Sequence, residues 1–271
     1  MQGELDALSL FLFLPADRLD RLGKAVASGA DAVILDLEDA VAPDRKEVAR
    51  RSLVGALDEA ARAKPIIVRV NAAGTQWHRD DLAAVAGLPL AAIMLPKTEC
   101  PHQCETVRME TGKPVLALVE SALGVHEALS IARSADRIAF GNLDFSADVS
   151  AEPHPDALAY ARSALVIASR LAGIPSPVDG VTKAFDDPEQ VERDAALARR
   201  MGFSGKLLIH PSQIAPARQA FLPSQDEINW ARRVVEATKD EGGVVTLDGQ
   251  MIDAPVVKRA RQILARIGSG D

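Results

Sequence analysis

The chain has 271 residues, of which 48% are hydrophobic, 25% are charged and only 4% are aromatic. This composition is ordinary for a globular protein with an aliphatic core, and the length fits one (β/α) barrel. The net charge of −7 argues against a nucleic-acid partner, which would need a basic face. No apolar run approaches the roughly 20 residues of a membrane span. The N-terminus MQGELDALSL lacks a basic signal-peptide region, so a cytoplasmic protein is expected.

Short apolar runs recur along the chain. Most are continuous, which is typical of strands that are covered on both faces. They cover residues 9–15, 32–38, 65–71, 91–97, 114–120, 136–142 and 206–212, with a weaker run at 176–181. The sequence therefore predicts eight strands.

Helix-like stretches separate these runs, among them residues 16–29, 44–63 and 187–202. The second stretch repeats Val48, Leu53 and Leu57 on one helical face. Strands that alternate with helices predict a parallel α/β fold, most simply a closed (β/α)8 TIM barrel. A doubly wound open sheet is the alternative, and the lack of a Gly-rich turn after the first strand weakens it.

The tail after residue 224 has a different pattern. Residues 224–242 predict one more amphipathic helix, followed by a Gly-rich hairpin-like piece and a final helix that starts near Asp253 or Pro255. A closed barrel does not need this tail. The predicted domains are thus a catalytic barrel of residues 1–223 and a helical appendage of residues 224–271.

The two cysteines, Cys100 and Cys104, lie four residues apart beside His102. A zinc site usually needs four ligands, and the chain has no second cluster of this kind. We therefore expect these thiols to be incidental.

The active site of a (β/α)8 barrel lies at the C-terminal ends of its strands. The residues that close the predicted strands form a ring of acids with a few bases: Arg18, Asp36, Glu38, Asp39, Arg69, Asn71, Lys97, Glu120, Asn142, Asp144 and His210. Charges at strand ends are often solvated loop residues, and this reading is equally open for Lys97 and Asp39. Glu120 differs because it ends the apolar strand LALVE, where an ordinary loop would carry Gly, Asn or Pro.

Acids in this position suit a hard divalent cation. Mg²⁺ prefers oxygen ligands and keeps several waters, so one or two carboxylates suffice. Glu120 and Asp144 end consecutive strands and can reach one ion. Asp36 and Glu38 share a strand face and would hold the waters of that ion. In the alternative reading, Arg69 pairs with Asp36 and only balances its charge.

Several segments together resemble the HpcH/HpaI aldolase and citrate lyase family. They are SLFLFLPADRLDRLGKA, VILDLEDAVAPDRKEVAR, IIVRVNA, IMLPKTE, ALVESALG, AFGNLDFSADVS, GFSGKLLIHPSQI and GQMIDAPVVKRA. The resemblance covers about residues 9–265. It is strongest to citrate lyase beta-subunit-like proteins and to their malyl-CoA, citramalyl-CoA and beta-methylmalyl-CoA lyase relatives.

The resemblance implies a (β/α)8 barrel that uses Mg²⁺, with Mn²⁺ as an alternative ion. By motif, Glu120 and Asp144 would be the metal ligands, and Arg69 would hold a carboxylate of the oxo acid. The acids of the family's DLED segment correspond to Asp36, Glu38 and Asp39. Arg18 and Lys97 are further candidates for substrate binding, whereas His210 is better explained as a hydrogen-bonded structural residue.

The resemblance also gives the tail a role. It implies that Asp253 acts as an acid or base in the active site of a neighbouring subunit, within a trimer or a pair of trimers. Helix capping is the alternative for Asp253, because Asp-Ala-Pro is a good helix start. The sequence departs from the family at Ser121, where threonine is usual, and at Ala16 and Ser150, where glycine is usual.

The implied reaction is reversible carbon–carbon cleavage of a 3-hydroxyacyl-CoA such as citryl-, citramalyl- or malyl-CoA. The products would be acetyl-CoA or propionyl-CoA and an oxo acid. One alternative is a pyruvate-dependent class II aldolase that acts without CoA. Those enzymes use a histidine in an early loop, and no histidine follows the first two strands here. The other alternative, a non-catalytic subunit of a lyase complex, is disfavoured by the intact Glu120, Asp144 and Arg69.

Overall fold

The computed structural model describes residues 5–239 and 245–265. The chain divides into two compact units, Met1–Arg218 and Gln219–Asp271, and each has its own hydrophobic core. The sequence prediction set this boundary after residue 223.

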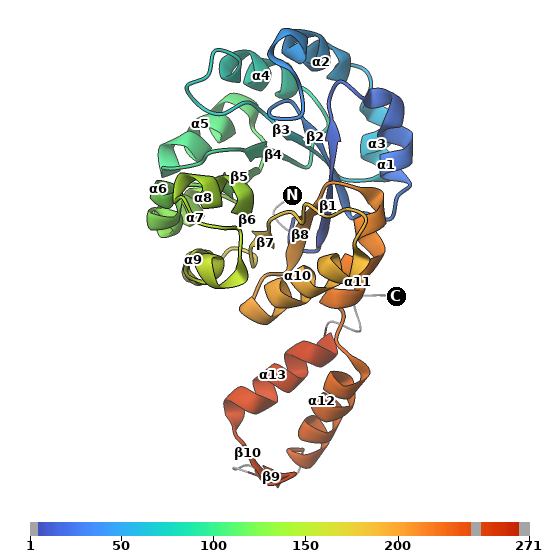
Figure 1. Ribbon diagram of the computed structural model, residues 1–271, viewed down its shortest axis with the longest axis vertical. Coiled ribbons are helices and arrows are strands. Elements are labelled where there is room, and N and C mark those ends of the chain that lie inside the picture. The colour runs from blue at the N-terminus through green and yellow to red at the C-terminus, as the bar shows by residue number, and fades with distance from the viewer. Residues whose placement is uncertain (1–4, 240–244, 266–271) are drawn as a thin grey trace. The chain divides into compact units, whose positions relative to one another are not determined.

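The first unit is a closed barrel of eight parallel strands with helices around its outside (Figure 1). β1 pairs with both β2 and β8, so the sheet closes on itself. The strands are β1 (Leu10–Pro15), β2 (Ala32–Asp36), β3 (Ile66–Arg69), β4 (Ala92–Leu95), β5 (Val115–Val119), β6 (Arg137–Phe140), β7 (Val178–Asp179) and β8 (Gly205–Leu208). The predicted (β/α)8 barrel is therefore confirmed, and the open sheet is excluded.

Helices connect the strands, as right-handed crossovers between parallel neighbours require. The α-helices are α1 (Leu22–Val26), α2 (Lys46–Leu53), α3 (Asp58–Ala63), α4 (His78–Val85), α5 (Pro101–Thr111), α6 (Ala122–His126), α7 (Ala128–Ser134), α8 (Asn142–Asp148), α9 (Pro155–Ala172), α10 (Pro188–Met201) and α11 (Ile214–Phe221). Short 3₁₀ turns are η1 (Leu19–Arg21), η2 (Pro43–Arg45) and η3 (Pro211–Gln213).

The structure corrects two of the predicted helices. The stretch 16–29 is helical only from η1 through α1. The stretch 44–63 is broken between α2 and α3, because Val54 is extended and Gly55 takes a left-handed φ of 80°. Val48 is 61% exposed, so the buried face of α2 is formed instead by Ala49 and Leu53.

The barrel interior explains which residues reach its mouth. Ile34, Ile67, Leu118 and Ala139 belong to the core cluster inside the barrel. Side chains alternate along a strand, so the position two residues later faces the same way. On these four strands the next inward positions are Asp36, Arg69, Glu120 and Gly141. On β2, β3 and β5 the inward row is thus apolar along the strand and becomes polar at the C-terminal end, whereas the inward row of β6 begins with Arg137 and ends with Gly141.

The opposite end of the barrel is closed by Arg137, which begins β6 and is fully buried. Its Nη1 donates to the carbonyl oxygens of Leu5 (2.6 Å) and Leu8 (2.7 Å), and its Nε donates to that of Ser176 (2.9 Å). Burial lowers the pKa of Arg137 to about 10. These carbonyl oxygens accept the hydrogen bonds of the guanidinium, so Arg137 holds the segment before β1 in place at the N-terminal end of the barrel.

The second unit consists of α12 (Gln225–Ala237), β9 (Val245–Leu247), β10 (Gln250–Ile252) and α13 (Ala254–Ala265). The strands form an antiparallel hairpin whose turn, Asp248-Gly249, has positive φ at both residues. The predicted helix over 224–242 ends at Ala237, and residues 240–244 lie outside the described part. Within residues 5–239 and 245–265, no helix is long and apolar enough to span a bilayer.

Candidate active site

Asp36 and Arg69 form the centre of the polar cluster at the mouth of the barrel. They are direct register partners on β2 and β3, which places their side chains next to each other. Arg69 donates from Nε to Asp36 Oδ1 (2.7 Å) and from Nη2 to Asp36 Oδ2 (2.6 Å). Burial disfavours the guanidinium charge, but the hydrogen bonds and the charge of Asp36 outweigh it and raise the pKa of Arg69.

The carboxylate of Asp36 is fully used by these contacts. Its Oδ1 also accepts the N–H of Glu38 (2.9 Å), and its Oδ2 accepts the N–H of Ala40 (3.0 Å). With two donors on each oxygen, Asp36 has little capacity left to hold the waters of a metal ion. Its observed partner is Arg69, as in the alternative reading of the sequence.

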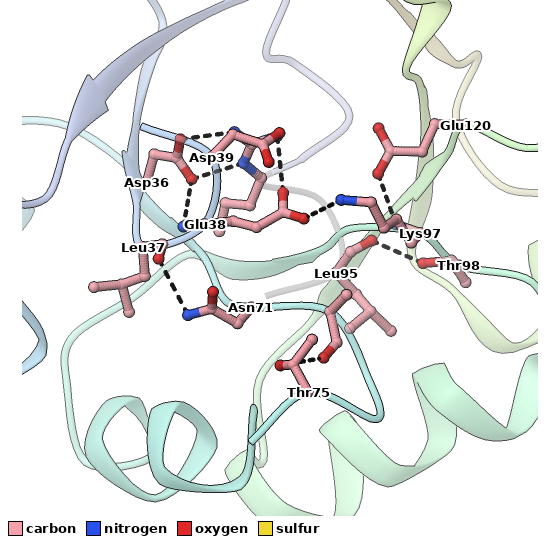
Figure 2. Close-up of polar contacts among 12 residues, drawn as sticks. Asp36, Leu37, Glu38, Asp39, Asn71, Thr75, Leu95, Lys97, Thr98 and Glu120 are labelled. Carbon is pink, nitrogen blue, oxygen red and sulfur yellow. Dashed lines mark hydrogen bonds and ion pairs between the residues drawn. The ribbon is translucent and has the colours of Figure 1, made fainter. Parts of the chain in front are cut away.

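Glu38 connects Arg69 to Lys97. Figure 2 shows its contact with Lys97. Its Oε2 lies 3.2 Å from Arg69 Nη1, an ion pair without hydrogen-bond geometry, and its Oε1 accepts the amine of Lys97. Burial raises the pKa of Glu38, although the charges of Arg69 and Lys97 oppose the shift. Asp39 lies further out, 56% exposed and 3.6 Å from Arg69 Nη1. Two basic side chains therefore offset the three clustered acids.

Lys46 is a member of this site that sequence reasoning missed. Its side chain is buried, and its amine donates to the carbonyl oxygens of Leu37 (2.8 Å) and Glu38 (2.7 Å). It also lies 5.1 Å from the centre of the Trp77 ring. Burial lowers the pKa of Lys46. The sequence carried no signal for this role, because a lysine early in a helix is ordinarily a solvated residue.

Two neighbouring cavities open at this end of the barrel. The larger, about 400 Å³, is lined by Glu38, Asp39, Asn71, Trp77 and Lys97 as well as Lys46. The smaller, about 60 Å³, is lined by Arg69, Glu120, Gly141, Asn142 and Asp144, with apolar walls that include Phe13. The structure thus brings the predicted metal ligands and the predicted carboxylate-binding arginine into one cavity.

Glu120 follows β5 and is only 4% exposed. In the described part of the chain its carboxylate has one hydrogen bond, from the N–H of Lys97 to Oε1 (2.7 Å), and no ion pair. Burial raises the pKa of Glu120 to about 8, since the Lys97 bond opposes the shift only in part and the negative charge of Asp144 adds to it. A buried carboxylate without a cationic partner is costly in a metal-free protein.

Asp144 lies in the first turn of α8, at the edge of the same small cavity. Its carboxylate has no hydrogen bond or ion pair with any other described residue. No group of three or more His, Cys, Asp and Glu gathers as a metal site within residues 5–239 and 245–265. Mg²⁺ needs only one or two carboxylates, and its charge would offset the repulsion between Glu120 and Asp144. The donor set therefore fits Mg²⁺.

Three other candidates make their described contacts elsewhere. The side chain of Arg18 is half-buried and pairs with Asp20. His210 Nδ1 bonds to Ser212 at the start of η3, which agrees with a structural role. Asp253 belongs to the second unit, where its Oδ1 accepts the N–H of Val256 (3.2 Å) and caps α13.

Two of the three departures from the family pattern have local explanations. Ser150 takes a positive φ of 54°, so the backbone keeps the conformation that glycine favours. Ser121 caps α6 by accepting the N–H of Gly124 and donates to Glu99 (2.6 Å).

The thiol of Cys104 is buried and its pKa is raised to about 12, which disfavours a thiolate metal ligand.

Comparison with known proteins supports the resemblance. Residues 9–211 match the model of the HpcH/HpaI aldolase/citrate lyase family, and residues 169–268 match that of the C–C bond lyases of the TIM-barrel fold. The chain is 34% identical to citrate lyase subunit beta of Leuconostoc mesenteroides, over 93% of this chain and 91% of that protein. It is 37% identical to (3S)-malyl-CoA thioesterase of Cereibacter sphaeroides, over 94% and 93%.

Solved structures of similar proteins point to the same family as these relatives. The CitE protein of Mycobacterium tuberculosis, in complex with magnesium, acetoacetate and coenzyme A, has a TM-score of 0.87 and 36% identity, covering 97% of this chain and 99% of that one. A citrate lyase beta subunit from the same organism, in complex with oxaloacetate and magnesium, has a TM-score of 0.70 and 34% identity, covering 81% and 100%. The chain therefore belongs to the HpcH/HpaI aldolase/citrate lyase family.

Proposed function

We propose that the protein is a Mg²⁺-dependent lyase that reversibly cleaves a carbon–carbon bond of a 3-hydroxyacyl-CoA carrying a second carboxylate. Malyl-, citramalyl- and citryl-CoA are substrates of this class. The observation that carries the proposal is the small cavity in which Glu120 and Asp144, neither of which forms an ion pair with another described residue, lie beside Arg69. The relative that binds magnesium, acetoacetate and coenzyme A supports it.

Glu120 and Asp144 would hold the metal. When bound, Mg²⁺ supplies a Lewis acid that lowers the pKa of the substrate hydroxyl and stabilises the charge that develops on its oxygen. Arg69 would bind the adjacent carboxylate of the substrate. Since its Nε/Nη2 edge is used by Asp36, the contact would be made by the Nη1/Nη2 end. The two hydrogen bonds with Asp36 fix the orientation of the guanidinium, and Glu38 links Arg69 to Lys97.

In the cleavage direction, the bond between the α-carbon and the hydroxyl-bearing carbon breaks. The hydroxyl passes its proton to solvent water and becomes the carbonyl of the oxo acid, while the electron pair remains on the α-carbon as the enolate of the acyl-CoA. The acid that later protonates this carbon regains its proton from solvent, so the reaction as a whole neither gains nor loses a proton. That carbon then needs a proton. We assign the proton donor to Asp253 of a neighbouring subunit in a trimer or a pair of trimers, and in the condensing direction the same carboxylate would remove the proton.

Thioester hydrolysis is the second candidate function, because one relative at 37% identity is a (3S)-malyl-CoA thioesterase. The two reactions differ in their products. A lyase releases an oxo acid and keeps the thioester in the shortened acyl-CoA, whereas a thioesterase releases free CoA and no oxo acid.

The test is an incubation of the full chain with malyl-, citramalyl- and citryl-CoA in the presence of Mg²⁺ or Mn²⁺, with EDTA as control. Oxo acid, acyl-CoA and free thiol are quantified separately. Equal amounts of oxo acid and acetyl-CoA, abolished by EDTA and by Glu120→Gln, are expected. Free thiol without oxo acid would replace the lyase proposal with hydrolysis, and the absence of all three products would overturn both.

A further inference from the structure

The side chain of Glu120 is confined by two neighbouring backbone segments. On one side is Lys97, whose φ of 50° is in the left-handed region that residues other than glycine rarely adopt. The N–H of Lys97 donates to Glu120 Oε1 at 2.7 Å (Figure 2). The unusual backbone at Lys97 thus coincides with a bond to the carboxylate.

On the other side is Gly141, directly after β6. A Cβ added at this position would lie 2.3 Å from Glu120 Oε2 and 2.4 Å from Glu120 Cβ, so no larger residue fits without displacing the glutamate. The φ of Gly141 is −89°, which any residue can adopt. The glycine is therefore required by space for Glu120 and not by backbone conformation.

We propose that Lys97 and Gly141 are positioning residues for the magnesium ligand Glu120, and we call this pair the Glu120 clamp. The inference rests on the proposed function, in which Glu120 binds Mg²⁺. The N–H of Lys97 fixes one carboxylate oxygen, and Gly141 leaves the room in which the other lies. Lys97 also pairs with Glu38, which contacts Arg69, so one residue links the metal ligand to the carboxylate-binding group.

The clamp assigns the effect on the metal to the backbone of Lys97 and not to its amine. Lys97→Gly and Lys97→Val both remove the amine, but glycine adopts the left-handed conformation freely and β-branched valine resists it. Titration of the metal-stripped full chain with Mg²⁺ in a calorimeter should show about 10- to 100-fold weaker binding for Lys97→Val. Binding by Lys97→Gly should stay within about threefold of wild type. Equal affinities of the two variants would overturn the proposal.

Gly141→Ala tests the other half of the clamp, and Gly87→Ala is its matched control because an added Cβ at Gly87 meets nothing within 4 Å. Mg²⁺ affinity should fall about 10- to 100-fold for Gly141→Ala and remain unchanged for Gly87→Ala. Wild-type affinity in Gly141→Ala would overturn the role of the glycine. If Gly141→Ala fails to fold, as its melting curve would show, the comparison at Lys97 decides alone.

A metal-free measurement separates failure of the clamp from failure of the proposed function. Hydrogen exchange of the Lys97 amide, followed by NMR without Mg²⁺, should be slow in wild type and faster in Glu120→Ala. If wild type binds no Mg²⁺, the lyase proposal fails, yet slow exchange that depends on Glu120 still supports the clamp. Fast exchange in wild type, or slow exchange unaffected by Glu120→Ala, would overturn it.

Discussion

The buried carboxyl of Glu120 should couple magnesium binding to proton release. Burial, with a further contribution from the charge of Asp144, raises the pKa of Glu120 to about 8 in the metal-free protein. A raised pKa means that the folded protein keeps this carboxyl protonated below that value. Mg²⁺ binds the ionised form, so the ion must displace the proton, and the apparent affinity should fall as the pH falls.

The magnitude follows from the ionised fraction of Glu120. With a pKa of about 8, the carboxyl is ionised to about 1% at about pH 6, about 10% at about pH 7 and about 90% at about pH 9. The apparent affinity for Mg²⁺ should therefore rise about 90-fold between the two ends of this range. At about pH 7, each ion bound should release about 0.9 of a proton.

Calorimetric titration of the metal-stripped protein, in buffers of different ionisation enthalpy, measures both the affinity and the number of protons released. Asp144→Asn is an informative variant, because removal of that charge should lower the pKa of Glu120 and move the rise in affinity to lower pH, in addition to weakening binding. An affinity that changes less than about threefold across this pH range, with no proton release at neutral pH, would refute the reasoning.

Three further predictions concern single side chains. Asp253→Asn keeps a good helix cap, so it should lower turnover about 10²- to 10⁴-fold without changing Mg²⁺ affinity, and unchanged turnover would remove this residue from the mechanism. Asp36→Asn deprives Arg69 of its buried partner and should reduce the free energy of unfolding in urea by roughly 3 kcal/mol; a loss below about 1 kcal/mol would contradict the pairing. Arg137→Met leaves several buried carbonyl oxygens without a donor and should reduce the free energy of unfolding by roughly 3 kcal/mol. The control, Arg133→Met at an exposed position, should change it by less than about 0.5 kcal/mol. Equal effects of the two substitutions would count against the role of Arg137.

The strands and the ends of the strands could be predicted from sequence because the barrel is covered on both faces. Continuous apolar runs mark such strands; seven of the eight runs contain the whole observed strand, and the run 206–212 contains all of β8 except Gly205. The change from apolar to charged residues then marks the mouth. Glu120 was singled out in this way, since the acid that ends LALVE has no local reason to be there, and the structure places it beside Asp144 and Arg69.

The role of Asp36 could not be decided from sequence. Its spacing from Glu38 allowed either contacts to metal-bound water or a pair with Arg69. In the structure Asp36 pairs with Arg69, because the two are direct neighbours across β2 and β3. Register is a property of the assembled sheet, and one residue of slip would turn Arg69 away from this partner.

Backbone conformation also escaped sequence reasoning. A helical repeat through Val48, Leu53 and Leu57 gave no sign that Gly55 would break the helix, because glycine is tolerated within helices at a cost of about 1 kcal/mol. The left-handed conformation of Lys97 had no signal either. The conformation of Lys97 coincides with a contact to a distant segment, the hydrogen bond to Glu120.

The pairing of β1 with β8 has a consequence for biosynthesis. β1 is synthesised early, but one of its two edges pairs with β8 (Gly205–Leu208), which is synthesised after the other seven strands. Until β8 has been synthesised, this edge of β1 is unpaired, and unpaired strand edges make incompletely folded chains prone to aggregation. Arg137, which reaches back to Leu5 and Leu8, offers the N-terminal segment an earlier anchor. A ribosome-bound chain stalled after β6 should therefore already protect that segment from proteolysis.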